Sequence, residues 1–304
     1  MSTIGYLHSG TPERFGRMSN PWKALENALP AGTDIKDMYG FNDPGLVESA
    51  AADLVNDNSV EVIVAAGGPG PALVLQAKTK TKPIVFTTVA DPVLSKLVDS
   101  LQKPGHNLTG MAGKTSELDA DRLVVLFQLA QAKLQKNDKV GVLLKYGRDH
   151  ADAHYKKLKD KADGSMLNLK LVPVSVTTVA GIKQAFDNFV KEKVKGLVVT
   201  ADSFFNDNRK EVAAEANTRG IPAIYQWKEF VLEEKGLISF GPDILEAYRK
   251  AGEYVKDILV NNRKPATMPC SEPAQFFIHI NTETARGLGI EVPETILGTQ
   301  VQSI

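Results

Sequence analysis

The architecture of this chain is indicated by VEVIVAAGG, residues 60–68, and by VKGLVVTAD, residues 194–202. Both are short apolar runs that stop at small or polar residues, the pattern of a strand that is buried on both faces of a parallel sheet. Longer stretches of helical pattern accompany them, for example at residues 48–56 and 211–219. Short strands that alternate with longer helices predict βαβ units and therefore an α/β fold with parallel sheets.

The two segments belong to a longer internal repeat. IGYLHSG, which begins at Ile4, resembles VGVLLKYG, which begins at Val140. KPIVFTT, residues 82–88, resembles IPAIYQW, residues 221–227. Three pairs of strand-like segments in the same order and at similar spacing indicate two lobes of similar construction. We therefore expect two doubly wound parallel-sheet lobes joined by a hinge.

Length and charge exclude several classes of protein. The chain has 304 residues, which favours two domains because a single core seldom grows beyond about 250 residues. Basic and acidic residues both number 36, so there is no positive excess of the kind that nucleic-acid binding needs. No stretch approaches the ~20 apolar residues of a membrane-spanning helix. The single cysteine, Cys270, has no partner for a disulfide and is expected in a loop.

Candidate ligand-binding residues follow from the expected sheets. Ligands of open parallel sheets bind beyond the carboxyl ends of the strands, where loops and helix N-termini converge. In the first half of the chain the residues at these ends are Ser9, Gly67, Gly68, Thr87 and Thr88. In the second half they are Tyr146, Asp202, Phe204, Tyr225 and Glu229.

The candidates of the first half each have a structural alternative. The backbone amides of Gly67 and Gly68 either hold an anion or simply turn the chain from strand to helix. The surrounding residues match neither a dinucleotide fingerprint nor a P-loop. The hydroxyls of Thr87 and Thr88 either donate to a ligand carboxylate or cap the next helix.

The candidates of the second half point to a cationic or aromatic group. A buried ammonium group needs a carboxylate partner, and we prefer Asp202 to Glu229 for this role. The alternatives are a helix cap for Asp202 and a solvated charge for Glu229. Phe204, Tyr225 and Tyr146 either stack on the ligand or belong to the core.

Neither a metal site nor a catalytic site is expected. His150 and His154 are four residues apart on a probable helix and can bind a metal as a pair, but the pattern supplies no third ligand. No nucleophile elbow and no zinc-protease motif occurs. The sequence therefore predicts no cofactor and no enzymatic activity.

Three long motifs resemble a known family. Residues 82–110 contain Asp-Pro-Val, Leu-Val-x-Ser-Leu and Pro-Gly-x-Asn-x-Thr-Gly, and further matches lie at 201–231 and 247–290. These segments resemble the ABC transporter substrate-binding proteins related to the tryptophan- and tyrosine-binding ones. The resemblance extends from Ile4 almost to the last residue. It implies a type I periplasmic-binding-protein fold with two lobes and three hinge crossings.

The resemblance also implies boundaries and partners. Lobe one would hold residues 1–112 and 238–270, lobe two residues 113–237 and 271–304, and the ligand cleft would lie between them. The expected partners are a small-molecule ligand and an importer permease, with contact to the membrane only through the permease and no nucleic acid. A monomer in the periplasm is expected, although this sequence shows no signal peptide.

We therefore expect the solute receptor of a bacterial ABC importer, which captures a small polar metabolite by lobe closure. An amino acid, an aromatic one included, or a related carboxylate would suit the candidate residues. Two other functions stay open. A cytosolic ligand-sensing domain of the same fold is disfavoured because no helix-turn-helix segment precedes Ile4. A doubly wound enzyme is disfavoured by the missing catalytic motifs.

Overall fold

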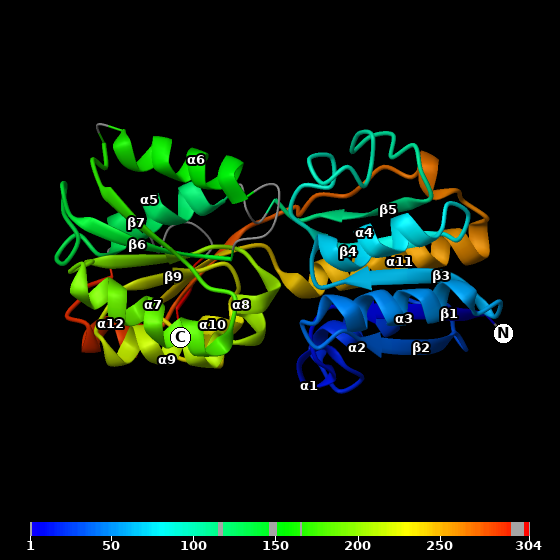
Figure 1. Ribbon diagram of the computed structural model, residues 1–304, viewed down its shortest axis with the longest axis horizontal. Coiled ribbons are helices and arrows are strands. Elements are labelled where there is room, and N and C mark those ends of the chain that lie inside the picture. The colour runs from blue at the N-terminus through cyan, green and yellow to red at the C-terminus, as the bar shows by residue number, and fades with distance from the viewer. Residues whose placement is uncertain (1, 115–117, 146–150, 165, 293–300, 304) are drawn as a thin grey trace. The chain divides into compact units, whose positions relative to one another are not determined.

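The chain forms two compact units (Figure 1). Unit one consists of residues 1–114 and 244–274, and unit two of residues 115–243 and 275–304. The computed structural model describes residues 2–303 except 115–117, 146–150, 165 and 293–300. The chain passes from one unit to the other three times.

The unit boundaries lie a few residues after the expected crossings. The largest difference concerns residues 238–243, which the sequence analysis assigned to lobe one. Residues Ile238–Gly241 form strand β10, which pairs with strands of unit two on both of its sides. Residues 271–274 were assigned to lobe two but belong to unit one, where Ser271 N donates to Gly110 O. In both cases sheet hydrogen bonds determine the unit.

Unit one is built on a five-stranded sheet in the order β2-β1-β3-β4-β5, in which all the strands are parallel. The strands are β1 (Thr3–His8), β2 (Asp34–Tyr39), β3 (Val60–Ala66), β4 (Ile84–Val89) and β5 (Leu108–Ala112). The helices are α1 (Pro12–Phe15), α2 (Asn20–Glu26), α3 (Pro44–Asn56), α4 (Pro69–Lys78) and α11 (Ile244–Asn261), with a short 3₁₀ turn at Pro265–Thr267.

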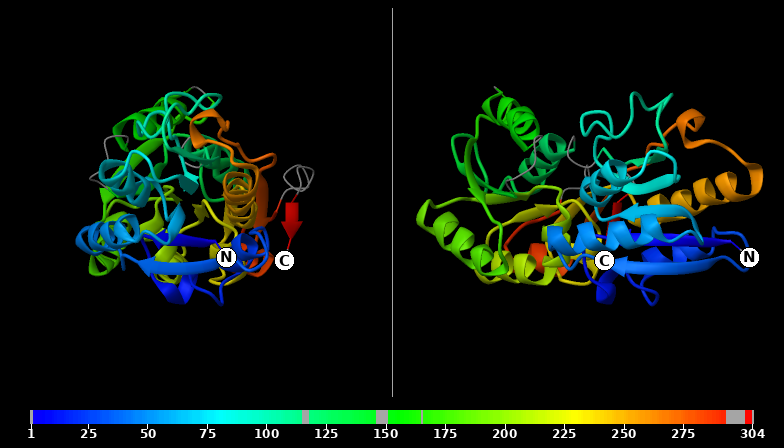
Figure 2. Two further views of the ribbon diagram at one scale, coloured as in Figure 1. Left: turned by 90° about the vertical axis from the view of Figure 1, so that its right-hand side faces the viewer. Right: turned by 45° about the vertical axis from the view of Figure 1, so that its right-hand side comes forward.

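Helices cover both faces of this sheet. In the left view of Figure 2, α11 (orange) lies on one side of the sheet, and α3 and α4 (blue to cyan) lie on the other. A Cβ on Gly252 of α11 would lie 2.6 Å from the Cβ of Ala28, so the glycine allows α11 to cross closely over the end of α2. Helix α3 begins where Asp43 Oδ1 accepts hydrogen bonds from the amides of Gly45 and Leu46.

Unit two contains a seven-stranded sheet in the order β12-β11-β10-β9-β8-β6-β7. Strand β11 runs antiparallel to β10, and the other neighbours are parallel. Its strands are β6 (Lys139–Leu144), β7 (Lys170–Ser175), β8 (Gly196–Val199), β9 (Ala223–Tyr225), β10, β11 (Phe277–Ile280) and β12 (Val301–Ser303). Its helices are α5 (Asp119–Leu129), α6 (Ala151–Asp163), α7 (Val179–Lys191), α8 (Ser203–Asp207), α9 (Arg209–Thr218), α10 (Glu229–Leu232) and α12 (Thr282–Gly287).

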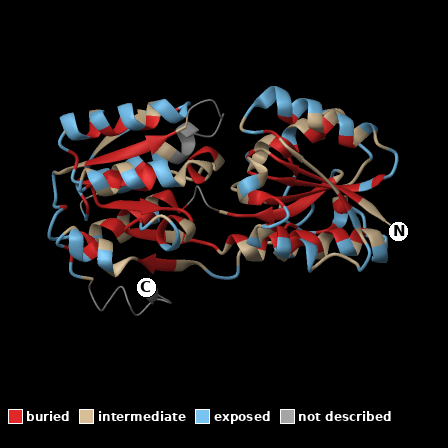
Figure 3. Ribbon diagram, turned by 90° about the horizontal axis from the view of Figure 1, so that it is seen from below, coloured by how far each residue is buried: buried red, intermediate tan, exposed pale blue. Residues whose placement is uncertain are grey.

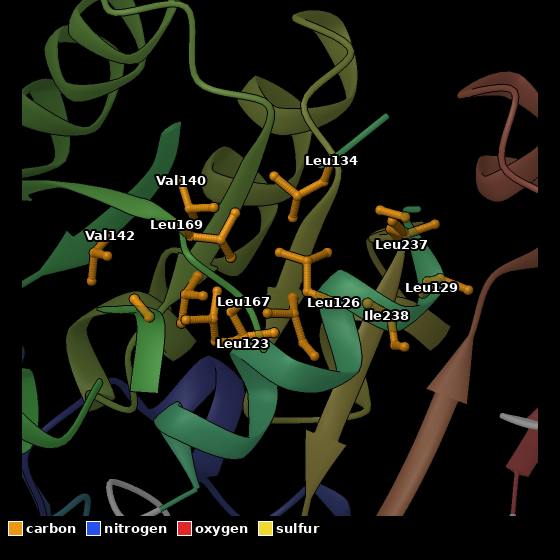
Figure 4. Close-up of a cluster of buried hydrophobic side chains, with 14 of the residues drawn as sticks. Leu123, Leu126, Leu129, Leu134, Val140, Val142, Leu167, Leu169, Leu237 and Ile238 are labelled. Atoms are coloured by element: carbon orange, nitrogen blue, oxygen red, sulfur yellow. The ribbon is translucent and has the colours of Figure 1, made fainter. Parts of the chain in front are cut away.

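The core of unit two packs α5 against the sheet. Leu123 and Leu126 of α5 are fully buried and belong to one cluster with Val140 of β6 and Ile238 of β10 (Figure 4). In both units the strands are buried and the outer faces of the helices are exposed (Figure 3). The expected α/β class with two parallel-sheet lobes is thus confirmed.

Candidate functional site

The carboxyl ends of β1 and β3 continue into two loops that are joined by a hydrogen bond. Ser9 Oγ donates a hydrogen bond to Gly67 O over 2.8 Å. Gly67 has φ +85°, and a Cβ there would lie only 2.2 Å from Ser9 Oγ. This position therefore requires glycine both for its backbone conformation and for space. The structure brings these two candidates together.

The loop of Gly67 leads directly into α4. Gly68, with φ 91°, occupies the N-cap position. Two prolines, Pro69 and Pro71, remove amide donors from the first turn, so Gly70 and Ala72 supply its remaining N–H groups. A Cβ on Gly70 would meet no atom within 4 Å, so there is open space beside the start of this helix.

Thr87 and Thr88 lie inside β4, whereas the sequence analysis placed them after its end. Thr87 is fully buried, Thr88 is half-buried, and their hydroxyl oxygens are 3.4 Å apart. The cap of the following turn is Asp91, whose Oδ1 accepts from the amides of Val93 and Leu94. Thr87 and Thr88 therefore do not cap the next helix, which was the alternative stated for them.

His8, the last residue of β1, completes this edge of the sheet and was not among the sequence candidates. It is 1% exposed, and its ring stacks on that of Phe15 with centroids 4.0 Å apart. Its Nδ1 accepts a hydrogen bond from Gly10 N over 2.8 Å. Its Nε2 has no hydrogen-bond partner among the described residues. Burial lowers the pKa of His8 to about 3, so the imidazole is neutral at pH 7.

In unit two, Asp202 is the N-cap of α8. Its Oδ1 accepts a hydrogen bond from Phe204 N over 2.8 Å, as the helix-cap alternative predicted. The backbone carbonyl of Asp202 accepts from Gln226 Nε2 over 3.4 Å, and the Gln226 side chain is fully buried. The ends of β8 and β9 are therefore linked through these two residues. A carboxylate has room for further donors, so the capping bond does not prevent ligand contact.

The aromatic candidates are mostly enclosed. Phe204 is 4% exposed, and the ammonium group of Lys145 lies 4.5 Å from its ring centroid. Tyr225 is fully buried and stacks on Phe230 at 4.5 Å. The ring of Tyr225 thus belongs to the core, which was the alternative stated for it.

The two remaining candidates are Glu229 and Tyr146. Glu229 is half-buried at the start of α10, and burial raises the pKa of its carboxyl group while the charges of Lys228 and Arg209 oppose this. Tyr146 lies outside the described residues, as does His150. Across the rest of the chain, no group of three or more His, Cys, Asp or Glu side chains is placed to hold a metal ion.

A buried ion pair that the sequence analysis did not identify lies behind these strand ends. Arg122 Nη1 donates to Asp119 Oδ1 over 2.5 Å, and Arg122 Nε donates to Phe240 O over 2.7 Å. Both side chains are almost completely buried. The pair connects α5 to β10 and fixes the end of the sheet that carries Asp202 and Gln226. A charged i,i+3 pair beside the buried leucines of α5 was the available sequence signal.

Comparison with known sequences identifies the family of the chain. Residues 31–304 match the model of a family described as ABC transporter substrate binding protein. The chain belongs to this family. No described helix of it is long and apolar enough to cross a membrane. The family identity is consistent with a chain that has a small-molecule ligand and an ABC transporter as its partners.

Several individual proteins are similar to this family member. It is 29% identical over 273 residues to a protein of Clostridioides difficile called tyrosine-binding protein, with 88% of this chain and 75% of that one covered. Its fold matches that of an ABC domain from Streptococcus pneumonia in complex with L-tryptophan, with TM-score 0.84, 22% identity and coverage of 99% and 100%. A ligand-free, open substrate-binding protein from Clostridium difficile matches with TM-score 0.65, 24% identity and coverage of 100% and 99%.

Proposed function

We propose that this chain is the receptor of an ABC importer and that it captures an amino acid, aromatic by preference, outside the cytoplasm. The observation that carries the proposal is the membership of residues 31–304 in the substrate-binding family. Two parallel-sheet units connected by three crossings suit a receptor that closes over its ligand, and closure would present one shape to the permease. No chemical step is part of this function.

Unit one supplies the groups that suit the ligand carboxylate. The edge formed by β1, β3 and β4 holds the hydroxyls of Ser9, Thr87 and Thr88 and the amides that follow Gly68. Hydroxyl and amide donors at a strand end are a common setting for a carboxylate.

Unit two supplies the groups that suit the rest of an amino acid. Asp202 would pair with the ammonium group, with Glu229 as the second choice. Phe204, 4% exposed beside Lys145, would border an aromatic side chain. The relative named tyrosine-binding protein supports an aromatic amino acid over other classes.

A binding experiment tests the proposal. The purified chain is first examined by native mass spectrometry for co-purified small molecules, and then titrated calorimetrically with L-tyrosine, L-tryptophan, L-phenylalanine and L-leucine. We expect micromolar or tighter binding of an aromatic member, with compaction in small-angle scattering on saturation. Binding of none of the four, or binding without any change in the scattering curve, would contradict the proposal. If mass spectrometry finds a sugar, the ligand is a sugar and the proposed amino acid is wrong.

A further inference from the structure

The structure points to a ligand contact that neither the sequence motifs nor the family resemblance identified, namely the imidazole of His8. We propose that His8 Nε2–H donates a hydrogen bond to the carboxylate of the bound ligand at the carboxyl end of β1. The inference rests on the proposed function, because it assigns one residue to the ligand site of unit one.

The tautomer of His8 is fixed by its neighbour. Gly10 N donates to Nδ1 over 2.8 Å, so Nδ1 carries the lone pair and not the proton. In the neutral ring the proton then lies on Nε2, which is a donor. That donor has no partner among the described residues, in a side chain that is only 1% exposed. A buried donor without an acceptor costs about 1–3 kcal/mol, so a fold that keeps one has a reason to keep it.

The ring lies at the strand end and not deep in the core. His8 is the last residue of β1, and its register partner Ala66 is the last residue of β3. The ring carbon Cε1, which is bonded to both nitrogens, faces the turn after β3, since a Cβ on Gly67 would stand 3.0 Å from it. The stack on Phe15 fixes the ring plane. The unpartnered Nε2 is therefore beside the same loop that Ser9 and Gly67 form.

The neighbouring strands place a hydroxyl on the same face of the sheet as the His8 ring. Side chains alternate along strands, so the pairing of Ala65 with Phe86 places Ala66 and Thr87 on the face that carries His8. Strands lie about 4.8 Å apart, so the backbones of His8 and Thr87 are separated by roughly 10 Å with only the small Ala66 between them. The carboxylate of the proposed ligand would lie between the His8 imidazole and the Thr87 hydroxyl.

Among the residues that the structure describes, no group accepts a hydrogen bond from this donor. The ring neighbours of His8 are aromatic, namely Phe15 and Tyr6. The Tyr6 hydroxyl donates elsewhere, to Phe15 O over 3.2 Å. The lowered pKa of His8 follows from its burial. A carboxylate from the ligand would be the missing acceptor.

The test compares two variants and two ligands. His8→Asn removes the Nε2 donor and keeps an oxygen that can accept from Gly10 N, whereas His8→Gln keeps an N–H close to the position of Nε2. With the amino acid that the wild type binds best, we expect affinity to fall about 10- to 100-fold in His8→Asn, the range for a hydrogen bond to a charged group. His8→Gln should recover most of it. With the matching amino alcohol, which lacks the carboxylate, His8→Asn and wild type should bind equally.

Each outcome has a distinct meaning. If the wild type binds no amino acid, the proposed function fails and the role of His8 falls with it. If the wild type binds and His8→Asn binds equally well, the inference alone is overturned and the Nε2 donor is held by a structural water. Nitrogen-15 NMR of the wild-type protein measures the exchange of the His8 Nε2 proton and needs no variant. Ligand should protect the Nε2 proton from exchange, and an unprotected proton in the saturated protein would overturn the inference even if His8→Asn fails to fold.

Discussion

Arg122 Nη1 lies 2.5 Å from Asp119 Oδ1 in the interior of unit two, one turn apart on α5. Arg122 also donates to Phe240 O, so a single side chain connects a helix to the end of β10. Such a pair is worth little over an apolar substitute, because desolvation offsets much of the attraction. Its value lies in position, since it holds the strand ends of unit two in a fixed arrangement.

Removing one partner of this pair should strongly destabilise the protein. Arg122→Met leaves the Asp119 carboxylate buried without its cation, at a cost of about 3–5 kcal/mol in the free energy of unfolding. Arg249→Ala, in the solvent-exposed pair with Glu253, is the control and should cost less than about 1 kcal/mol. Urea unfolding followed by circular dichroism measures both. Equal midpoints for the two variants would show that the buried pair contributes no more to the free energy of unfolding than the exposed pair.

Gly67→Ala should destabilise unit one. The substitution places a Cβ at φ +85° and 2.2 Å from Ser9 Oγ, so both strain and a clash result, for a loss of about 1–3 kcal/mol. Gly70→Ala, in the first turn of the same helix, is the control. Its Cβ would meet nothing within 4 Å, and a helical glycine gains about 0.4–1 kcal/mol from this change. The melting temperature should therefore fall in Gly67→Ala and rise in Gly70→Ala. A change in the same direction in both variants would refute the conformational argument.

The sequence predicted the fold class well because apolar runs mark strands that are buried on both faces. Val60–Ala66 and Val140–Leu144 are such runs. Strand β2 was missed because its residues, DIKDMY, are mostly polar and half-buried at the sheet edge. Strand β10 was missed because its residues, ISFG, contain no continuous apolar run, and this displaced the expected lobe boundary. Strands with a continuous apolar run could therefore be predicted, and strands without one could not.

The candidate site was predictable in place but less so in detail. Ser9 and Gly67 meet at the edge where the sequence placed them, because parallel strands bring their carboxyl ends together. Tyr225 proved to be a core residue, and Asp202 a helix cap, because local sequence does not show which neighbours enclose a ring or an oxygen. His8 was overlooked because an isolated histidine gives no sign of an unpaired nitrogen.

Acid should destabilise the protein through His8. Its pKa is about 3 when folded and about 6.5 when unfolded, so between these values only the unfolded chain binds the proton. Stability is therefore unaffected above pH 6.5 and falls as the pH decreases from 6.5 towards 3, by about 2 kcal/mol at pH 5. His8→Gln cannot titrate, so the stability difference between wild type and variant should shrink by this amount between pH 7.5 and pH 5. Urea midpoints at the two pH values measure it, and a constant difference would contradict the lowered pKa.

Asp202→Asn should weaken ligand binding and leave the fold intact. Asparagine caps helices about as well as aspartate and can still accept from Phe204 N, so the melting temperature should stay within error. The loss of charge should cost about 1.5–3 kcal/mol if the carboxylate pairs with the ligand ammonium group. Asp43→Asn is the matched control, because Asp43 caps α3 in the same manner through Gly45 N. Calorimetry with an aromatic amino acid measures the affinity of both variants. Unchanged affinity in Asp202→Asn would make Glu229→Gln the next variant, and unchanged affinity there as well would exclude these two carboxylates as partners of an ammonium group.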